Sequence, residues 1–526
     1  MLLNVFESRS NTTYDIRAME HIFFSPRSHL RTIIIRPLRN SPYSIISSRK
    51  TMSSFAAAPY RHDVTPFDTT QDAQTHGNPA LDKLKDAIPD LKIYTRSSPR
   101  YETLRGVYNK LVTAKPLALC RPTSVAQVQA IVKATTGLDV PLGVRCGGHD
   151  VFGRGCIADS ITIDMRELDT QELAQDKKTV TVGGGITSKN LVGFLGLHGL
   201  CTSNGFAGEA GWTSWASWGG YGPLGDYVGL GVDNIVGAKI VTANGDLVTT
   251  HGESELLWAV RGGGGNFGII VETKVQVYPM SKIQAGFIVY PWPETAGVLL
   301  RLQALLDSGV PDKLCVQAGF SKGEWGLGMA LTYIWPEAET IGPESEKWLQ
   351  ELKNLGTCIV DTVQETTFQA FQSSISSDIS DPVNVTSRHA SIAKFTSATV
   401  TQLIDACEAI PQEADCTVAC TILHGKAARP NTSSAFGTRR PHIMLHINAV
   451  TETAAQEGVA IAWSDHLVDG VEATGDSIGP TYVSFMETGK DARGCYGDSW
   501  DRLRAVKKEV DPDDVFRFVH GRISAV

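Results

Sequence analysis

Two glycines precede a histidine at the end of the segment Gly-Val-Arg-Cys-Gly-Gly-His, residues 143–149. Glycine lets the backbone come close to a ligand and expose its N–H groups to a phosphate. A histidine held at the end of such a loop could form a covalent bond to a flavin ring. A histidine in an ordinary loop looks the same in a sequence, so the interpretation depends on the rest of the chain.

Further segments combine β-type residues with glycines in the same way. They are Val-Thr-Val-Gly-Gly-Gly-Ile-Thr at 180–187, the tryptophan-rich stretch 205–222 that ends Trp-Gly-Gly-Tyr-Gly, the run 233–246 with its Ala-Asn-Gly-Asp turn, and the glycine-rich run 257–270. Their order and spacing resemble the PCMH-type flavin-binding domain of the vanillyl-alcohol-oxidase-like flavoproteins, in the berberine-bridge-enzyme-like branch. The resemblance runs from about Pro116 to the C-terminus.

This resemblance implies an FAD cofactor and the residues that would contact it. In the family, the loop that corresponds to 145–150 wraps the flavin, and His149 matches the histidine that bonds to its 8α-methyl carbon. The alternative is contact between His149 and FAD without a bond. The expected cofactor-binding residues are Arg145, Cys146, Gly147, Gly148, His149, Asp150, Ala210, Gly211, Gly219, Gly220, Gly222 and Ile270.

The chain departs from members of the family that attach the flavin twice. Those members carry a cysteine at a fixed spacing before the tyrosine of the Gly-Gly-Tyr-Gly motif. Ala207 occupies that position here, so we expect attachment through His149 only, with Cys201 as a packed thiol. Ala210 follows at the family position beside the flavin carbon that reacts with oxygen. A small side chain there leaves room for O2 and favours an oxidase over a dehydrogenase.

Two tyrosines are the catalytic candidates, because oxidation by a flavin needs a base near the substrate O–H or N–H. The run 481–487 resembles a family Tyr-x-Asn-Tyr run, in which Tyr482 matches a base or orienting group, although Ser484 and Phe485 replace the usual asparagine and second tyrosine. Tyr221 matches a tyrosine that pairs with this base in some members. A free tyrosine has a pKa near 10, so either phenolate needs stabilising neighbours. A structural hydroxyl is the alternative for each.

Other chemically capable side chains have more ordinary interpretations. Trp212, Trp215 and Trp218 could line the substrate cavity or pack in the core. His446 could line the cavity, but a hydrogen-bonded histidine within a sheet is the favoured interpretation.

Cys416 and Cys420 are interpreted as buried free thiols. Arg439 and Arg440 are interpreted as structural residues or as contacts at the rim of the cavity. No cluster has convincing metal-ligand spacing, so we expect no metal.

The strands and helices expected from the sequence, which must position these residues, indicate an α+β protein of two lobes. Residues 76–282 are expected to form the FAD-binding domain, 283–470 an α+β substrate domain with an antiparallel sheet, and 471–526 a C-terminal segment that returns to the FAD domain. Alternation predicts strands over 140–144, 160–165, 179–182, 287–290, 314–320, 327–333, 416–423 and 443–450. Helical periodicity predicts helices over 122–135, 188–197, 295–307, 344–355 and 500–510, and 81–99 is interpreted as a helix and an exit loop.

Composition limits the partners. The chain of 526 residues is 42% hydrophobic and 20% charged, with a formal net charge of −8. The acidic balance argues against nucleic acid or an anionic membrane as a partner, and no run approaches the ~18 apolar residues of a membrane span. We expect a small-molecule substrate and O2 as partners; the oligomeric state is open.

The first 75 residues are expected to be a disordered leader or targeting segment. Residues 21–62 carry several arginines and no acidic residue, which suits a mitochondrial transit segment, while Met52 is a plausible alternative start. No secretory signal is evident, so a cytoplasmic or mitochondrial location is favoured.

These observations predict an FAD-dependent oxidase of a small alcohol, amine or C–H next to a heteroatom that produces H2O2. The resemblance is closest to fungal members, which often serve secondary metabolism. One alternative is a dehydrogenase with a non-oxygen acceptor, and another is a redox-inactive scaffold or cyclase.

Overall fold

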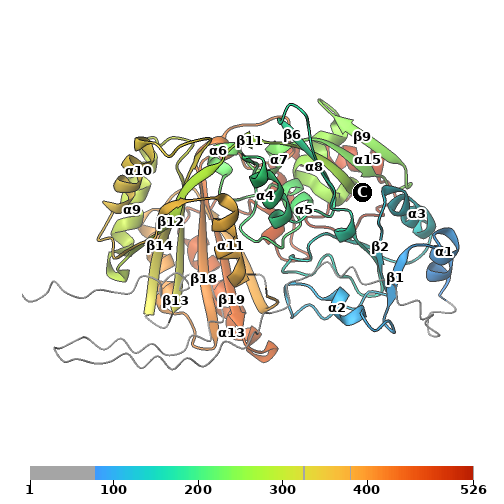
Figure 1. Cartoon of the computed structure of the whole chain (residues 1–526). Coiled ribbons are helices and arrows are strands. Elements are labelled where there is room, and N and C mark those ends of the chain that lie inside the picture. The colour runs from blue at the N-terminus through green and yellow to red at the C-terminus, as the bar shows by residue number, and fades with distance from the viewer. Residues whose placement is uncertain (1–77, 324–325, 380, 525–526) are drawn as a thin grey trace, which may run out of the picture.

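The computed structural model describes residues 78–323, 326–379 and 381–524, so the predicted leader at 1–75 and the start at Met52 lie outside the described residues. The described chain forms two lobes that lie side by side in Figure 1. Its helices and mostly antiparallel sheets confirm the predicted α+β class.

A four-stranded sheet begins the first lobe. Its order is β1 (Lys92–Thr95), β2 (Ala118–Arg121), β4 (Ile161–Asp164) and β3 (Leu142–Arg145), with β1 antiparallel and the others parallel. The helices here are α1 (Pro79–Ala87), α2 (Tyr101–Arg105) and α3 (Val125–Thr135), and the 3-10 turn η2 (Met165–Glu167) follows β4. The Ser124 side chain caps α3 by accepting from the Gln127 N–H. β1 corrects the exit loop expected within 81–99, because pairing with β2 rather than local pattern makes it a strand.

The second sheet of this lobe is antiparallel. Its order is β5 (Gln171–Leu173), β6 (Thr179–Gly183), β10 (Ile269–Gln276), β8 (Ile235–Val241) and β9 (Leu247–His251). Around it lie α4 (Ser188–Leu197), α5 (Trp212–Ser217), α6 (Gly225–Val228), α7 (Gly231–Asn234), α8 (Glu255–Gly263) and η3 (Gly264–Phe267). The short strands β7 (Leu200–Cys201) and β11 (Tyr278–Pro279) pair where the chain leaves this lobe. The predicted turn at 243–246 joins β8 to β9, with Gly245 at φ +75°.

An eight-stranded antiparallel sheet forms the second lobe. Its order is β15 (Val360–Asp361), β12 (Lys282–Tyr290), β14 (Gly326–Glu337), β13 (Cys315–Gly323), β18 (Ala414–Leu423), β19 (His442–Thr451) and β17 (Asn384–Ile392), and β16 (Gln364–Thr366) also pairs with β12. Its helices are η4 (Trp292–Glu294), α9 (Thr295–Asp307), α10 (Pro343–Lys353), α11 (Phe368–Ile379), α12 (Ser397–Glu408) and α13 (Glu457–Ala473), with the turns η5 (Lys426–Ala428) and η6 (Ala454–Gln456).

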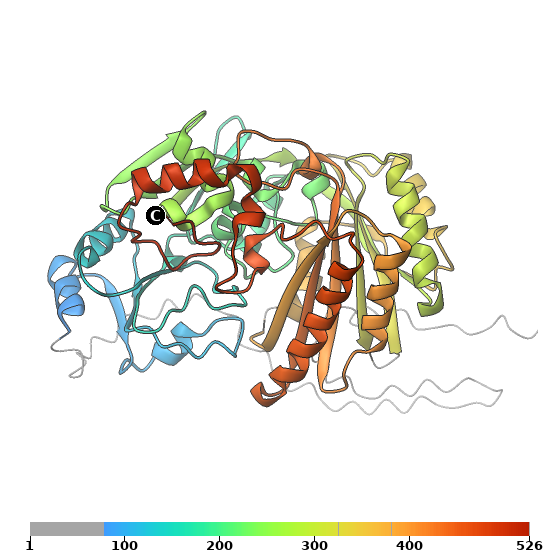
Figure 2. The same ribbon diagram turned by 180° about the vertical axis from the view of Figure 1, so that it is seen from behind.

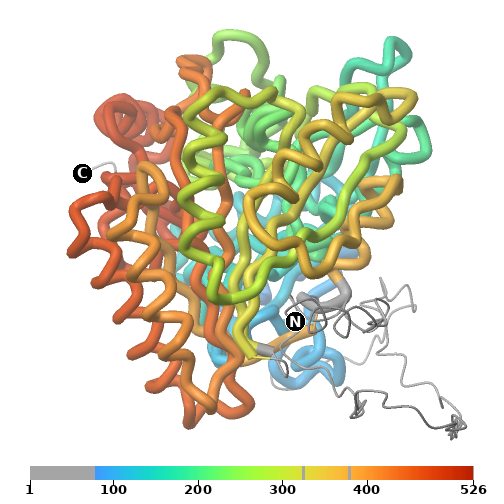
Figure 3. The backbone as a smooth tube through the Cα atoms, turned by 90° about the vertical axis from the view of Figure 1, so that its left-hand side faces the viewer, coloured from blue at the N-terminus to red at the C-terminus, as the bar shows by residue number. Residues whose placement is uncertain are grey.

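Helices cover the outer face of this sheet, as Figures 2 and 3 show. α9, α12 and α13 contribute apolar residues such as Leu302, Leu403 and Trp463 to a core shared with the sheet residues Phe320 and Leu445. Because side chains alternate along a strand, the other face is free to point toward the first lobe. The sheet therefore presents one sealed face and one face available for a site.

The C-terminal segment crosses back to the first lobe. It contains η7 (Val483–Phe485), α14 (Arg493–Tyr496), η8 (Gly497–Ser499) and α15 (Trp500–Val510), the red helix across the top of Figure 2. The fully buried Lys507 donates to the Asn266 carbonyl at 2.9 Å and pairs with Asp511 at 2.6 Å. Asn266 Oδ1 in turn accepts from the Ile523 N–H at 2.9 Å. These bonds attach the end of the chain to the loop before β10.

No helix within the described ranges is long and apolar enough to cross a bilayer.

Candidate active site

A cavity of about 1160 Å³ lies between the two lobes, at or above the upper end of the ~300–1,000 Å³ typical of small-ligand pockets. One wall consists of the loop after β3, the region around α5 and the C-terminal residues 516–520. The other wall is the inner face of β13, β14, β18 and β19. The volume is enough for a large cofactor and a small substrate together.

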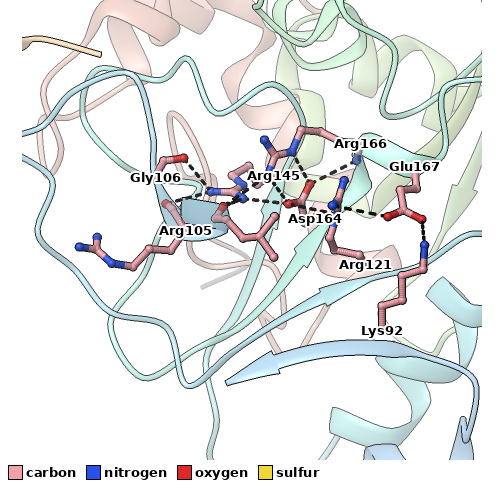
Figure 4. Close-up of polar contacts among 9 residues, drawn as sticks. Lys92, Arg105, Gly106, Arg121, Arg145, Asp164, Arg166 and Glu167 are labelled. Carbon is pink, nitrogen blue, oxygen red and sulfur yellow. Dashed lines mark hydrogen bonds and ion pairs between the residues drawn. The ribbon is translucent and has the colours of Figure 1, made fainter. Parts of the chain in front are cut away.

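A buried cluster of arginines stands at the base of the loop after β3 (Figure 4). Asp164, which is fully buried, lies 2.8 Å from Arg145, 2.6 Å from Arg166 and 3.8 Å from Arg121. Burial would raise the pKa of Asp164, but Arg145 and Arg166 outweigh it and hold the pKa well below its usual range. Glu167 lies 3.5 Å from Arg121, so three guanidinium groups face two carboxylates, and the positive charge that is left beside the loop suits an anionic pyrophosphate.

The glycines of the loop allow it to lie against a second segment of the lobe. A Cβ on Gly147 would lie 2.2 Å from the Glu209 carbonyl oxygen, so only glycine fits there. Gly148 has φ +73°, in the left-handed region. The segment that this loop contacts brings Ala207 and Ala210 to the cavity wall.

The structure brings most of the expected cofactor-binding residues to this one cavity. They are Arg145, Cys146, Gly147, Gly148, His149, Asp150, Ala210, Gly211 and Ile270. The Cys146 thiol donates to the Gly184 carbonyl at 3.3 Å, so this side chain packs against neighbouring backbone.

Gly219, Gly220 and Gly222 are not among the residues that line the cavity, and their expected cofactor contact stays a prediction. An added Cβ would lie 2.6 Å from the Phe436 ring at Gly219, 2.5 Å from the Gly231 backbone at Gly220, and 2.0 Å from the Asn204 carbonyl at Gly222. Gly220 and Gly222 allow backbone segments to pack tightly beside Tyr221, and Gly219 leaves room for the Phe436 ring.

His149 lines the cavity and stacks on Tyr108, with ring centroids 4.1 Å apart and an angle of 16° between the rings. Tyr108 was missed from the sequence. It lies before β2, outside every glycine-rich motif, and no spacing or residue pattern marks it.

Arg154 connects the cofactor loop to the turn that carries the expected catalytic tyrosine. It binds Asp150 through Nε at 3.1 Å and Nη2 at 2.6 Å. It also donates to the carbonyls of Val483 at 3.2 Å and Ser484 at 2.9 Å, within η7. Burial would raise the pKa of Asp150, but Arg154 outweighs it and holds the pKa well below its usual range. Arg154 was missed from the sequence, because residues 150–154 form a loop in which no periodic spacing marks a partner.

The expected catalytic tyrosines lie together at the cavity, with ring centroids 4.8 Å apart. The Tyr221 hydroxyl lies 2.9 Å from His442 Nε2, and His442 Nδ1 lies 2.7 Å from the Arg440 carbonyl. A carbonyl can only accept, so Nδ1 carries the hydrogen, Nε2 is the acceptor, and Tyr221 donates to it. Burial lowers the pKa of His442 to about 4, which keeps this ring neutral.

Both phenols are protonated at neutral pH. Burial raises the pKa of Tyr482 to about 12, although hydrogen bonds involving Ser484 and the Gly220 backbone act to lower it. Burial also raises the pKa of Tyr221 well above its usual range. Tyr221, whose hydrogen is directed to His442, can present oxygen lone pairs to the cavity.

The three tryptophans were expected either to line the cavity or to pack in the core, and the structure shows both. Trp215 and Trp218 line the cavity, whereas Trp212 is fully buried and donates to the Ser203 carbonyl at 2.8 Å. Trp212 is therefore a core residue, because the first turn of α5 directs it into the lobe.

The sheet wall of the cavity is largely uncharged and polar. Its residues include Gln317, Thr332, Thr417, Thr421, His446 and Asn448. His446 stacks on Phe485 at 3.8 Å and lies 3.1 Å from Ser387 Oγ, so it both lines the cavity and is hydrogen-bonded within the sheet. The sequence favoured only the second role. Burial lowers the pKa of His446 to about 3.

The remaining candidates have structural environments. Cys201, Cys416 and Cys420 are buried free thiols, and Cys416 also reaches the cavity. Arg439 pairs with Asp233 at 2.7 Å, away from the cavity wall. Across the described ranges, no group of three or more His, Cys, Asp or Glu residues could hold a metal ion.

The residues of the first wall fit FAD. Thr213 Oγ1 and His520 Nδ1 are buried at the cavity wall without a hydrogen-bond partner, which suits a polar ligand. Burial, reinforced by Arg154, lowers the pKa of His520 to about 3, so its ring is neutral. Together with the positive charge around Arg145 and the exposed loop backbone, these atoms match a cofactor that has both a pyrophosphate and a ring with hydrogen-bonding edges.

Comparison with known proteins agrees with this site. Residues 116–251 match the model of the FAD binding domain family, and residues 486–521 match the berberine and berberine-like family. The chain is 81% identical over 502 residues to the FAD-linked oxidoreductase aurO of Gibberella zeae, covering 95% of this chain and 99% of that protein.

Solved structures with the same fold include 6-hydroxy-D-nicotine oxidase from Arthrobacter nicotinovorans, with a TM-score of 0.74 at 21% identity over 83% of this chain and 98% of that one. The berberine bridge enzyme from Eschscholzia californica gives a TM-score of 0.74 at 17% identity, over 84% of this chain and 98% of that one.

A two-lobed α+β fold with an FAD-fitting cavity between the lobes defines a flavin-dependent oxidoreductase. This chain belongs to the berberine-bridge-enzyme-like family of FAD-linked oxidoreductases.

Proposed function

We propose that this enzyme is an oxidase with a single covalent flavin link through His149. It would oxidise a small alcohol, amine or C–H next to a heteroatom, with O2 as acceptor and H2O2 as product. The observation that supports this most strongly is one cavity that holds the His149 loop, Ala210 and the Tyr221–Tyr482 pair together.

The wall formed by 145–150 would hold FAD, with the arginine cluster beside its pyrophosphate and His149 bonded to its 8α carbon. Ala207 offers no thiol for a second link. Bound FAD would supply a two-electron acceptor whose electrons pass on to O2. Ala210, at the cavity wall, leaves space for O2 to approach.

The two tyrosines would position the substrate and move its proton. The Tyr221 oxygen would accept a hydrogen bond from the substrate O–H or N–H, because its own hydrogen is held by His442. Tyr482 is the proposed base, and its phenolate is the reactive form. The sheet wall, with Gln317, Asn448 and Thr417, would bind uncharged polar groups of the substrate.

The chain is similar to a fungal FAD-linked oxidoreductase, and we propose a role in fungal secondary metabolism, as the family resemblance implies. The nicotine-derivative oxidase among the similar folds is consistent with oxygen as acceptor.

Reoxidation by O2 separates an oxidase from a dehydrogenase without a known substrate. The purified holoenzyme is photoreduced without air and mixed with aerated buffer, and the return of the flavin absorbance is followed with H2O2 production. Fast return with stoichiometric H2O2 is expected. Slow return with O2 but fast return with a quinone dye would instead indicate a dehydrogenase, and protein that binds no FAD would indicate a scaffold.

A further inference from the structure

Tyr108 contacts the histidine proposed to carry the flavin, yet it belongs to neither the motifs nor the tyrosine pair. Its ring is nearly parallel to the His149 imidazole, at 4.1 Å and 16°, and both rings reach the cavity. A stacked ring restricts rotation of the imidazole about its side-chain bonds, because tilting would lose the contact.

The backbone of Tyr108 is fixed by both lobes. Its N–H donates to the Gly148 carbonyl at 2.9 Å, and its carbonyl accepts from the Val383 N–H at 2.9 Å. The next residue, Asn109, donates to the carbonyls of Val151 at 2.7 Å and Val385 at 2.9 Å. The Tyr108 ring is therefore held on a short segment joined to the loop on one side and to β17 on the other.

The ring face, rather than the hydroxyl, is the feature of Tyr108 that can act on His149. Burial raises the pKa of Tyr108 to about 12, so its phenol stays protonated at neutral pH and is a poor base. The stacked geometry places the ring face, and not the ring edge, against the imidazole.

We propose that Tyr108 is the positioning residue for flavin attachment, because its ring holds the His149 imidazole in one orientation for bond formation. This inference rests on the proposed covalent link. In that link, one imidazole nitrogen loses its hydrogen and bonds to the 8α carbon, which loses one C–H hydrogen. The two electrons and two protons released are taken by O2 to give H2O2, so atoms and electrons balance.

The test compares variants of the full chain in the rate at which they attach FAD. Each protein is purified after riboflavin-limited expression and incubated with FAD in air, and acid-stable flavin fluorescence on a denaturing gel is followed over time. Tyr108→Phe keeps the ring, Tyr108→Leu and Tyr108→Met remove it, and Tyr227→Leu is a matched control at a half-buried tyrosine outside the cavity. Total bound FAD and the thermal midpoint are measured for each.

Tyr108→Phe and Tyr227→Leu are expected to attach FAD at the wild-type rate. Tyr108→Leu and Tyr108→Met should attach it roughly 3- to 10-fold more slowly, with total bound FAD unchanged. Wild-type attachment in either ring-removed variant overturns the proposal, as does a Tyr108→Phe variant as slow as they are. If Tyr108→Leu does not fold, Tyr108→Met and Tyr108→Phe decide. Wild-type protein that binds FAD but never attaches it would show that the proposed covalent link itself fails.

Discussion

At the residue scale, the two tyrosines of the cavity differ in what their hydroxyls can do. The hydrogen of Tyr221 is committed to His442, whose other nitrogen is held by the Arg440 carbonyl. Tyr482 has no such histidine and stands at the start of η7, beside Phe485. This asymmetry is the basis of the proposal that Tyr221 orients the substrate and Tyr482 removes its proton.

Replacing Tyr482 by phenylalanine tests that assignment. With a pKa of about 12, only a small fraction of Tyr482 is ionised at neutral pH, and that fraction rises about tenfold per pH unit. We expect the rate of flavin reduction by a substrate found through H2O2 screening to rise with pH in the wild type. Tyr482→Phe should lower this rate by about 10²–10⁴-fold and abolish the rise. A variant that keeps the wild-type rate and pH profile would assign the base elsewhere.

The second prediction at the residue scale concerns Ala210 and the reaction of the reduced enzyme with O2. A leucine at this position of the cavity wall would fill the space proposed for O2. Ala210→Leu should slow reoxidation of the photoreduced enzyme by O2 and leave reoxidation by a quinone dye unchanged. The same substitution at Ala130, a partly buried residue of α3 away from the cavity, is the control. An unchanged rate with O2 would remove Ala210 from the account.

At the element scale, the position of the loop after β3 depends on the neighbouring strand β4, whose last residue pairs with Arg145 at the start of the loop. Asp164 at the end of β4 is the carboxylate that Arg145, Arg166 and Arg121 share, and Arg121 also lies 3.5 Å from Glu167. Removing its charge leaves three buried or nearly buried guanidinium groups without their shared counter-ion. The loop geometry is therefore coupled to the charge on β4.

Asp164→Asn is expected to destabilise the protein by about 3–5 kcal/mol in denaturant unfolding. Asp159→Asn, which removes one partner of the exposed pair with Arg96, should change stability by no more than about 1 kcal/mol. Because the pKa of Asp164 is depressed, its stabilisation is complete above the ordinary carboxyl pKa of about 3.9 and is lost as pH falls below it. Equal effects of the two substitutions would show that the cluster does not hold the loop.

Much of the element pattern was predictable, because it follows from local periodicity. The helices Ser188–Leu197 and Thr295–Asp307 and the strands β13, β14, β18 and β19 were found where the apolar spacing placed them, whereas β17 was not predicted. β1 was missed because pairing with β2, not its own sequence, makes it a strand. Periodicity therefore identified several elements with a buried face of their own, but it missed short strands such as β1 and also the longer β17, α12 and α13.

The site was predictable only where residues lie within motifs. The loop 145–150 and the two tyrosines came from motif resemblance, and the structure places them in one cavity. Tyr108 and His442 were missed because each contacts its partner through space, 41 and 221 residues away along the chain. Gly219, Gly220 and Gly222 pack against neighbouring segments and do not line the cavity, and the sequence alone cannot distinguish such a glycine from one that approaches a ligand.

At the scale of the whole molecule, four buried or half-buried neutral histidines lie at or next to the cavity between the lobes. His389 and His446 lie side by side on the sheet, His442 supports Tyr221, and His520 reaches the cavity from the C-terminal segment. Burial lowers their pKa values to about 4 for His389 and His442, and about 3 for His446 and His520. Protonation would place charge inside the protein, and only at His520 does a carboxylate, that of Asp150 at 3.9 Å, partly offset it.

Stability should therefore fall in mild acid. The unfolded chain binds protons near pH 6.5 and the folded chain does not until about pH 4, so acidification through this window favours unfolding. Each histidine contributes up to about 1.4 kcal/mol per pH unit. His442→Gln should reduce the slope of unfolding free energy against pH, while the exposed His198→Gln should not. A flat profile between pH 7 and 4 would show that these histidines are not held neutral.

The covalent flavin link through His149 is the central claim, and acid precipitation of the purified holoenzyme tests it most directly. The pellet is washed, digested with protease and analysed by mass spectrometry. We expect the yellow colour to stay with the pellet and the peptide containing His149 to carry the mass of FAD, whereas His149→Ala releases its flavin. Flavin recovered wholly in the supernatant of the wild type would contradict the account.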